Sequence, residues 1–158
     1  MVGFVDEFIN QKGKKMKEAE IQTKFFKIIR SLEFSFEYPE AEWVHAIPNG
    51  ARVSIGQAVK LKRQGLVSGV ADVFVPIPNG GYHGMYIEFK TRTGRLSKTQ
   101  DAFCSHCLNY GYIYTVCRDA VEAVESLREY LKPLLMKRRR IAAKKYKNTA
   151  SAQGLDKC

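Results

Sequence analysis

The sequence of 158 residues contains only four cysteines and no long run of apolar residues. So few cysteines do not suggest the disulfide framework of a small extracellular protein. No apolar run reaches the roughly eighteen residues of a membrane-spanning helix, so we expect no membrane partner. The first residues include acids and lack an apolar core, unlike a secretory signal. We therefore expect the protein in the cytoplasm.

Internal repeats and long linkers are also absent. The chain is 45% hydrophobic and 27% charged, which is typical of a soluble globular protein. A chain of this length can bury one core without the help of disulfides. We expect an N-terminal extension at residues 1–16, one globular domain at residues 17–135 and a basic tail at residues 136–158.

Basic residues outnumber acidic ones by 26 to 16, which gives a net charge of +10. This excess favours a polyanionic partner, because bound cations release counterions from nucleic-acid phosphates. Residues 137–147 hold seven of the basic residues and no acid, so the rest of the chain carries only +3. The tail is either a solvated helix end or an arm that grips a nucleic-acid backbone, and we favour the arm. Its candidates for backbone contacts are Lys137, Arg138, Arg139 and Arg140.

Two short segments rich in β-branched and aromatic residues carry the most informative charges. Residues 69–75 contain Asp72, and residues 86–90 contain Glu88 and Lys90. A stretch rich in Pro, Asn and Gly separates them, so both segments are predicted to be strands joined by a loop. Alternation along the second strand places Glu88 and Lys90 on one face and their apolar neighbours on the other.

Two carboxylates and a lysine in this pattern indicate metal-assisted phosphodiester chemistry. Proteins hold Mg²⁺ through one or two carboxylates, and the cation positions water and neutralises phosphoryl oxygens. Asp72 and Glu88 are the candidate ligands, and Lys90 would place a positive charge beside the attacking water or the developing oxyanion. The alternative is that all three are ordinary polar residues of a solvated strand face. We favour the catalytic interpretation, because an acid inside an apolar run is costly to bury without a partner or a metal.

The chain resembles the VRR-NUC branch of the PD-(D/E)XK nuclease superfamily, and in particular its short stand-alone members from phages and bacteria. The resemblance covers most of residues 17–131 and depends on the order and spacing of several motifs. The motifs are Glu18-Ala19-Glu20-Ile21-Gln22, Pro48-Asn49, Lys62-Arg63-Gln64-Gly65, Gly69-Val70-Ala71-Asp72, Ile87-Glu88-Phe89-Lys90 and Gly94-Arg95-Leu96-Ser97-Lys98-Thr99-Gln100. Ala71 stands where the superfamily name has proline.

The resemblance implies an α/β fold with a restriction-endonuclease-like core. In that core a mixed central sheet of about four strands is flanked by helices in the order αβββαβ, and a C-terminal helix follows. The resemblance also implies that Asp72 and Glu88 bind Mg²⁺ or Mn²⁺, that the Phe89 carbonyl joins them and that Lys90 is the catalytic lysine.

Two further residues take on roles through the resemblance. Gln100 corresponds to the glutamine that follows the core motif and would lie close to the site. Glu20 corresponds to an acid on the first helix that completes or supports a metal site. Glu18 is the less favoured candidate for that position, since only one of the two acids can face inward.

The implied activity is structure-selective cleavage of DNA, with branched DNA such as Holliday junctions as the expected substrate. Stand-alone members resemble resolving enzymes that act as homodimers, and a two-fold dimer would supply two active sites for paired cuts. Three alternatives remain open. The first is a repair or restriction-like nuclease that acts on flaps, nicks or duplex DNA. The second is a DNA-binding module that does not cleave, and the third is a basic scaffold whose tail binds RNA or a protein.

Basic residues flank the candidate site in the sequence. A predicted helix over residues 55–64 leads towards Asp72, and a glycine-containing loop over residues 91–96 follows Lys90. These cations either contact DNA phosphates or belong to solvated surfaces. The candidates for DNA contacts are Lys60, Lys62, Arg63, Arg92 and Arg95.

Apolar spacing predicts the N-terminal elements. A helix over residues 18–32 should bury one stripe, formed by Ile21, Phe25, Ile28, Ile29 and Leu32. Residues 42–47 are predicted to be a strand that ends at a Pro-Asn-Gly turn. His45 within that strand is more readily explained as a hydrogen-bonded structural histidine than as a substrate contact.

Capping signals predict the C-terminal elements. Residues 97–100 and 119–122 each form a capping box, and the first of these explains Gln100 without catalysis. A buried strand over residues 112–117 should run parallel to an earlier strand, because a helix connects them. Pro133 should kink or end the last helix. Cys104 and Cys107 form a C-x-x-C pair, which we interpret as buried small residues in preference to a zinc site.

Overall fold

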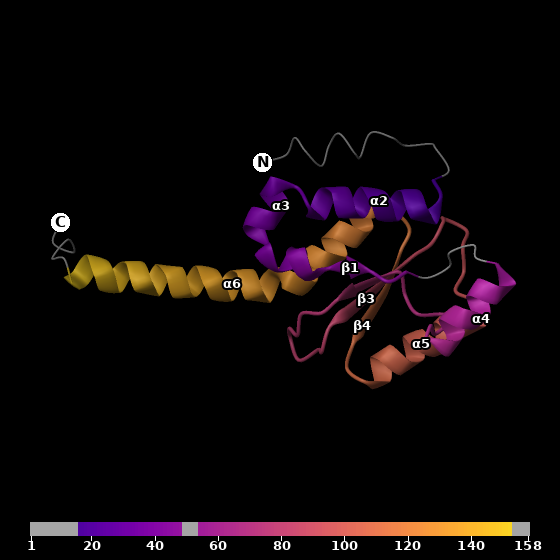
Figure 1. Cartoon of the computed structure of the whole chain (residues 1–158). Coiled ribbons are helices and arrows are strands. Elements are labelled where there is room, and N and C mark those ends of the chain that lie inside the picture. Colours follow the sequence, from indigo (N-terminus) through magenta and orange to yellow (C-terminus); the bar gives the residue numbers. More distant parts are fainter. Residues whose placement is uncertain (1–15, 49–53, 153–158) are drawn as a thin grey trace.

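Four strands form one mixed β-sheet in the computed structural model, which describes residues 16–48 and 54–152 (Figure 1). The sheet order is β1 (His45–Ala46), β2 (Val73–Val75), β3 (Met85–Phe89) and β4 (Ile113–Cys117). β1 and β3 each pair antiparallel with β2, and β4 pairs parallel with β3. The expected α/β fold with a mixed sheet of about four strands is confirmed, including the parallel pairing of the last strand.

Helices cover both faces of the sheet (Figure 1). They are α2 (Glu18–Ile29), α3 (Leu32–Glu37), the 3₁₀ helix η1 (Pro39–Trp43), α4 (Ile55–Arg63), α5 (Lys98–Asn109) and α6 (Ala120–Ala152). α2 and the first part of α6 pack with the sheet around the main core, and α5 packs against β4 from the other side. The predicted order αβββαβ is present, with α3, η1 and α4 as additional short helices.

The N-terminal helix buries its apolar stripe almost as predicted, and the buried members are Ile21, Phe25, Ile28 and Ile29. Leu32 is the exception, since it is 90% exposed and the prediction that it joins the core is wrong. The cause is local, because the Ser31 side chain accepts a hydrogen bond from the Phe34 N–H and thereby caps a new helix. The chain changes direction at this cap, and Leu32 leaves the buried face.

The predicted strand over residues 42–47 is mostly replaced by η1, and only two residues pair in β1. The Arg30 guanidinium donates hydrogen bonds to three carbonyls of this segment, at distances of 2.7 to 2.9 Å. The acceptors belong to Ala41, Glu42 and Val44. These carbonyls are therefore satisfied by the end of α2 instead of by a longer strand ladder.

The helix that follows β3 begins with the predicted capping box. Ser97 Oγ accepts from the Gln100 N–H at 3.3 Å, and Gln100 Oε1 accepts from the Ser97 N–H at 2.9 Å. The helix ends before Gly111, whose φ of +72° suits a turn that only glycine adopts readily. β4, predicted to be buried, is half-buried over most of its length, and only Cys117 in it is fully buried.

The last helix begins where predicted, with Asp119 Oδ1 accepting from the Glu122 N–H at 2.8 Å, although the Glu122 carboxylate accepts from the Arg118 N–H and not from that of Asp119. The helix continues through Pro133 to Ala152. The helix therefore does not end at Pro133, and of the two predicted outcomes, a kink or an end, only the kink applies. Figure 1 shows the helix axis bending where α6 leaves the body, which fits a proline that removes one helical hydrogen bond. Among the residues that the structure describes, no helix is both long and apolar enough to cross a membrane.

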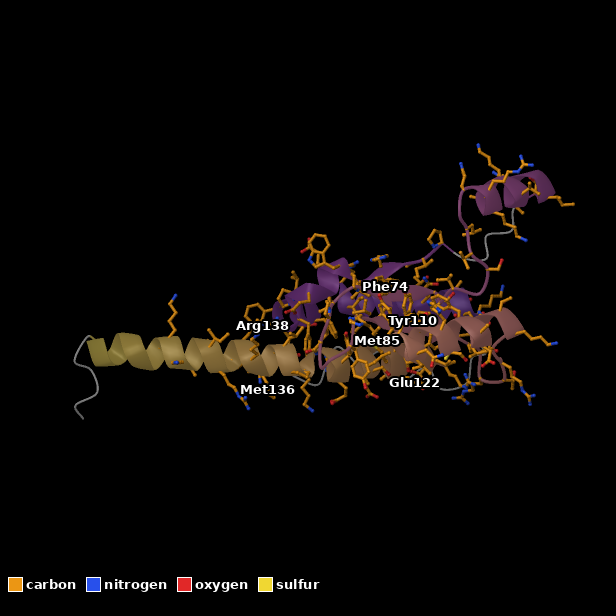
Figure 2. All side chains as sticks on the ribbon, turned by 90° about the horizontal axis from the view of Figure 1, so that it is seen from below. Phe74, Met85, Tyr110, Glu122, Met136 and Arg138 are labelled. Carbon is orange, nitrogen blue, oxygen red and sulfur yellow. The ribbon has the colours of Figure 1, made fainter. Side chains whose placement is uncertain are left out.

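Helix α4 stands apart from the rest of the protein, as Figure 2 shows. The Ser54 side chain caps its first turn by accepting from the Gln57 N–H, and none of its residues is buried. Ile55 is 86% exposed, which is unusual for a large apolar side chain. The helix therefore presents most of its surface, including its last-turn cations, to a partner or to water.

Candidate active site

Asp72 lies immediately before β2 and connects two neighbouring strands. Its carbonyl accepts a hydrogen bond from the Ile47 N–H at 2.8 Å. Its carboxylate Oδ2 accepts from the Phe89 N–H, also at 2.8 Å. The second bond places the Asp72 carboxylate beside the end of β3, where Glu88 and Lys90 lie.

Glu88 is the most deeply buried acid of the described chain, with 1% of its surface exposed. Its neighbours Ile87 and Phe89 enter the main core on the opposite face of the sheet. The predicted alternation along this strand is therefore confirmed. A carboxylate at this depth must be compensated by nearby donors or by a cation, because an unpaired buried charge costs several kcal/mol.

Two side chains provide that compensation at the same oxygen of Glu88. Lys90 Nζ lies 2.6 Å from Glu88 Oε1 and is itself only 7% exposed. Gln100 Nε2 also donates a hydrogen bond to Glu88 Oε1. Gln100 thus uses its Oε1 for the cap of α5 and its Nε2 for the acid, so the capping role and the site role coexist.

The acid that the first helix brings to this cluster is Glu18 and not Glu20. Glu18 Oε1 lies 4.0 Å from Lys90 Nζ and accepts from the Thr91 N–H at 3.3 Å. Glu20 is exposed, and its carboxylate accepts from the Lys17 N–H at the start of α2. Glu18 shares the helix face of the buried stripe because it precedes Ile21 by three residues, and this spacing was a usable signal in the sequence.

Tyr114 is a site residue that the sequence did not single out. Its hydroxyl donates to Glu88 Oε2 at 3.4 Å. The parallel register pairs Tyr114 with Tyr86 and Val116 with Glu88, so Tyr114 and Glu88 meet as diagonal neighbours on one face. Only this register, which the sequence does not specify, brings the phenol to the acid.

Burial raises the pKa of both Asp72 and Glu88 above the ordinary carboxyl value. The Phe89 N–H lowers the pKa of Asp72, and the Lys90 hydrogen bond lowers that of Glu88, but neither effect outweighs burial. Each group has a higher pKa in the folded protein than in the unfolded chain, so the unfolded chain loses its proton first as the pH rises. Stability therefore falls between the unfolded-state pKa and the folded-state pKa. Above that window both acids carry charge that a cation would offset.

Within residues 16–48 and 54–152, no three His, Cys, Asp or Glu side chains form a ready-made metal cluster. The buried Glu88 carboxylate and the half-buried Asp72 carboxylate lie beside one main-chain segment. Such a pair still fits a hard divalent cation, which needs one or two acids and fills its remaining positions with water or phosphate. Asp72, Glu88 and the Phe89 carbonyl are therefore a suitable donor set for Mg²⁺ or Mn²⁺. Glu18 is the nearby acid that could support it.

A close backbone contact holds the Asp72 segment against the start of α5. Gly69 has a φ of +88°, and a Cβ atom there would lie 2.5 Å from the backbone carbonyl carbon of Thr99. This approach brings the chain that leads into Asp72 next to the helix turn that carries Gln100. A side chain at position 69 would separate the two halves of the site.

The cations predicted to contact DNA occupy three regions. Lys60, Lys62 and Arg63 lie exposed in the last turn of α4, and Arg92 and Arg95 lie exposed in the loop between β3 and α5. Lys137, Arg139 and Arg140 lie exposed on α6, whereas Arg138 is half-buried and pairs with Glu40. The first two regions adjoin the acids along the chain, and the third belongs to the distant part of α6.

The histidine and the cysteines for which the sequence favoured a structural role lie as follows. His45 is exposed and its Nδ1 lies 2.9 Å from the Trp43 carbonyl oxygen, which agrees with the favoured interpretation of a hydrogen-bonded histidine. Cys107 is buried and Cys104 half-buried as free thiols. Burial raises the pKa of Cys107 to about 11, so this thiol stays protonated at neutral pH. The predictions for residues 1–15, for Asn49 and for the end of the tail at residues 153–158 lie outside the described residues.

Comparisons with known proteins agree on one domain type. The family model described as VRR-NUC domain matches residues 16–120. A solved structure titled "VRR_NUC domain protein" has a TM-score of 0.63 and 25% sequence identity to this chain, covering 75% of this chain and 91% of that one. None of the curated proteins matches the chain.

Replacing Gly69 with alanine should destabilise the protein more than the same change at Gly65. Both glycines have positive φ, so each alanine costs about 1–2 kcal/mol of backbone strain. No atom lies within 4 Å of a Cβ at Gly65, whereas Gly69→Ala also meets Thr99 and should lose about 1–3 kcal/mol more. Urea unfolding of both variants measures the difference. Equal losses would show that the close contact does not constrain the site.

Mg²⁺ should raise the melting temperature of the wild type but not that of Asp72→Asn. Binding at ten times Kd stabilises by about 1.4 kcal/mol, which corresponds to roughly 3–6 °C for a domain of this size. In metal-free buffer the variant should be at least as stable as the wild type above the acidic range, because it removes a half-buried charge whose pKa is raised by burial and keeps an oxygen for the Phe89 N–H. Thermal scans with and without Mg²⁺ provide the measurement, and equal shifts in both proteins would contradict a metal site at Asp72.

Proposed function

Because the chain belongs to the VRR-NUC family of nuclease domains, we propose that it is an endonuclease that hydrolyses phosphodiester bonds in DNA with Mg²⁺ or Mn²⁺ as cofactor. The observation that carries the proposal is that Asp72, Glu88 and Lys90 meet at the end of β3, where Lys90 pairs with Glu88 and the Asp72 carboxylate accepts from the N–H of Phe89 between them. Substrate and cofactor would both be found in the cytoplasm, the expected location.

In this proposal Asp72, Glu88 and the Phe89 carbonyl hold the cation. A bound divalent metal supplies Lewis-acid stabilisation of the phosphoryl oxygens and lowers the pKa of a bound water. Glu18 takes the supporting role that the resemblance implied for Glu20, because its carboxylate lies 4.0 Å from the Lys90 ammonium. Asp72 and Glu88 would be deprotonated when the metal is bound, since carboxylates bind a metal ion in their charged form.

Lys90 and Gln100 position and stabilise the reacting groups. Lys90 pairs with Glu88 before substrate binds, so its ammonium is already aimed at the oxygen that would share the metal. From there it can orient the attacking water or stabilise the oxyanion that develops on the phosphate. Gln100 fixes the orientation of Glu88 through its Nε2, and the capping box fixes Gln100 in turn.

Exposed cations beside the acids would hold the DNA backbone. Arg92 and Arg95 lie on the loop that leads from Lys90 to α5, so they reach phosphates close to the cleaved bond. The last turn of α4 adds Lys60, Lys62 and Arg63 on a helix that stands clear of the body (Figure 2). Such contacts provide affinity and register without reading the base sequence.

The substrate that we propose is branched DNA of the Holliday-junction type, cleaved by a homodimer. Support comes from the family resemblance and from the symmetry argument that two related sites suit paired cuts. Flaps, nicks and plain duplex DNA are the alternative substrates for the same site. The intact set of Asp72, Glu88 and Lys90 favours a cleaving enzyme over a module that only binds DNA.

Lys90→Met should lower the cleavage rate by on the order of 10²-fold and leave DNA affinity nearly unchanged. Methionine keeps the buried aliphatic stem of a side chain that is only 7% exposed, so the fold is preserved while the ammonium is lost. Single-turnover cleavage and anisotropy titrations separate the two effects. Lys132→Met, at an exposed cation paired with Glu129, is the matched control and should cleave like the wild type. Unchanged turnover in Lys90→Met would remove Lys90 from the mechanism.

The test of the proposed function is cleavage of end-labelled four-way junction, 5′ flap, single strand and linear duplex in Mg²⁺ and in Mn²⁺. Paired symmetric cuts in the junction, absent in Asp72→Asn, are the expected result. Cuts confined to the flap or the duplex would reassign the enzyme to repair or restriction-like substrates. A junction that is bound but never cut, in either metal, would establish the DNA-binding module instead.

A further inference from the structure

The basic end of α6 lies far from the catalytic residues of its own chain. The Lys90 N–H donates to the Cys117 carbonyl at 3.0 Å, and α6 starts three residues later at Ala120. The helix therefore begins at the catalytic edge and runs away from it, as Figure 1 and Figure 2 both show. At ~1.5 Å per residue, Arg140 and Lys144 lie about 30 and 36 Å along the helix from its start.

We call residues 139–152 the arm. All of its residues from Arg139 to Tyr146 are exposed, and they include the cations Arg139, Arg140, Lys144 and Lys145. In both views this part of α6 projects beyond the body (Figures 1 and 2). Because the side chains from Arg139 to Tyr146 are exposed, little burial stabilises this part of the helix, and the arm would gain stability from a bound partner.

The direction of the arm is fixed at its root. Arg138 pairs with the Glu40 carboxylate and donates to the Glu37 carbonyl at 2.8 Å. Figure 2 labels Arg138 at the place where α6 leaves the body. Arg139 lies 3.6 Å from the Glu37 carboxylate. These contacts fasten the helix to α3 and η1 just before the exposed part. Arg138 is thereby engaged within the chain, and the cations beyond it remain on the outer part of the helix.

The charge of the arm selects a polyanion as its partner. Residues 137–147 carry seven cations and no acid, so packing against the same arm of a second copy would bring like charges together. A phosphate backbone has the complementary charge and a spacing that several cations on one helix can follow. Contacts to phosphates carry no direct information on the base sequence, so they would hold the DNA in place and would not read its bases.

The distance determines which part of a DNA substrate the arm can meet. One turn of B-DNA spans about 34–36 Å, or roughly ten base pairs. The cations of the arm lie a comparable length along α6 from its start beside the site. The bend of α6 shortens the straight line between a phosphate in the active site and a phosphate on the arm, whereas DNA that follows the protein surface takes a longer path. Both contacts on one DNA molecule therefore require about ten base pairs or more between them.

We propose that the arm binds the backbone of a second segment of the substrate, roughly ten base pairs or more from the phosphate that is cleaved. This inference rests on the proposed DNA-nuclease function and specifies its substrate as DNA whose branches are longer than one helical turn. The active site then selects the phosphate to be cut, and the arm holds a more distant stretch of the same molecule.

The experiment compares branched DNA with hairpin-capped arms of about 8 and about 30 base pairs. The test variant is Arg140→Gln with Lys144→Gln, which removes two exposed cations, and Lys132→Gln is the control on the packed part of the same helix. Cleavage kinetics in Mg²⁺ are measured for each protein, together with anisotropy binding in EDTA over a range of salt concentrations.

On the long substrate the double variant should raise KM on the order of tenfold without changing kcat, and the slope of log Kd against log salt should fall by about 1.8. On the short substrate it should match the wild type, and the control should match on both. Equal losses on both lengths, or no loss on either, would overturn the proposal. Sedimentation that shows a dimer in the wild type and a monomer in the double variant would instead assign the arm to a contact between copies of the chain. If the wild type cleaves neither substrate but the salt slope still changes with length, the nuclease function fails and the distant DNA contact stands.

Discussion

Burial of the Glu88 carboxylate beneath the first turn of α5 is the constraint on which the site depends. A charge at this depth needs compensation, and the surrounding structure supplies it from three separate elements: Lys90 on the same strand, Gln100 on α5 and Tyr114 on β4. Each donor must be held in place for the acid to remain buried. The capping box of α5 and the parallel pairing of β4 are therefore requirements of the site as well as features of the fold.

The cationic surface is organised separately from this buried network. α4 buries none of its residues, and the arm of α6 has only exposed residues up to Tyr146, so neither contributes to the core. Because burial does not account for their basic surfaces, a partner is the simplest physical reason for them. The catalytic edge and the arm lie at opposite ends of α6, and a DNA molecule that reaches both is held at two separated places.

Local signals in the sequence predicted much of this arrangement. Period-two alternation placed Glu88 and Lys90 together, and two capping boxes located the starts of α5 and α6. Predictions failed where a tertiary contact replaced a local one. Ser31 starts a new helix that turns Leu32 outward, and the Arg30 guanidinium takes up carbonyls that a longer edge strand would have used. Glu18, the less favoured of two acids on the first helix, is the one that meets Lys90, because it lies three residues before the buried Ile21.

The sequence by itself determined which residues alternate, where helices begin and which charges are available, because these depend on neighbours within a few positions. Only the tertiary structure decided which acid of the first helix meets Lys90, that Tyr114 reaches Glu88 and that Gly69 touches Thr99. It also decided that the basic end of α6 points away from the site. The physical reason is that strand register and helix packing are set by burying one common core, which residues distant in sequence form together.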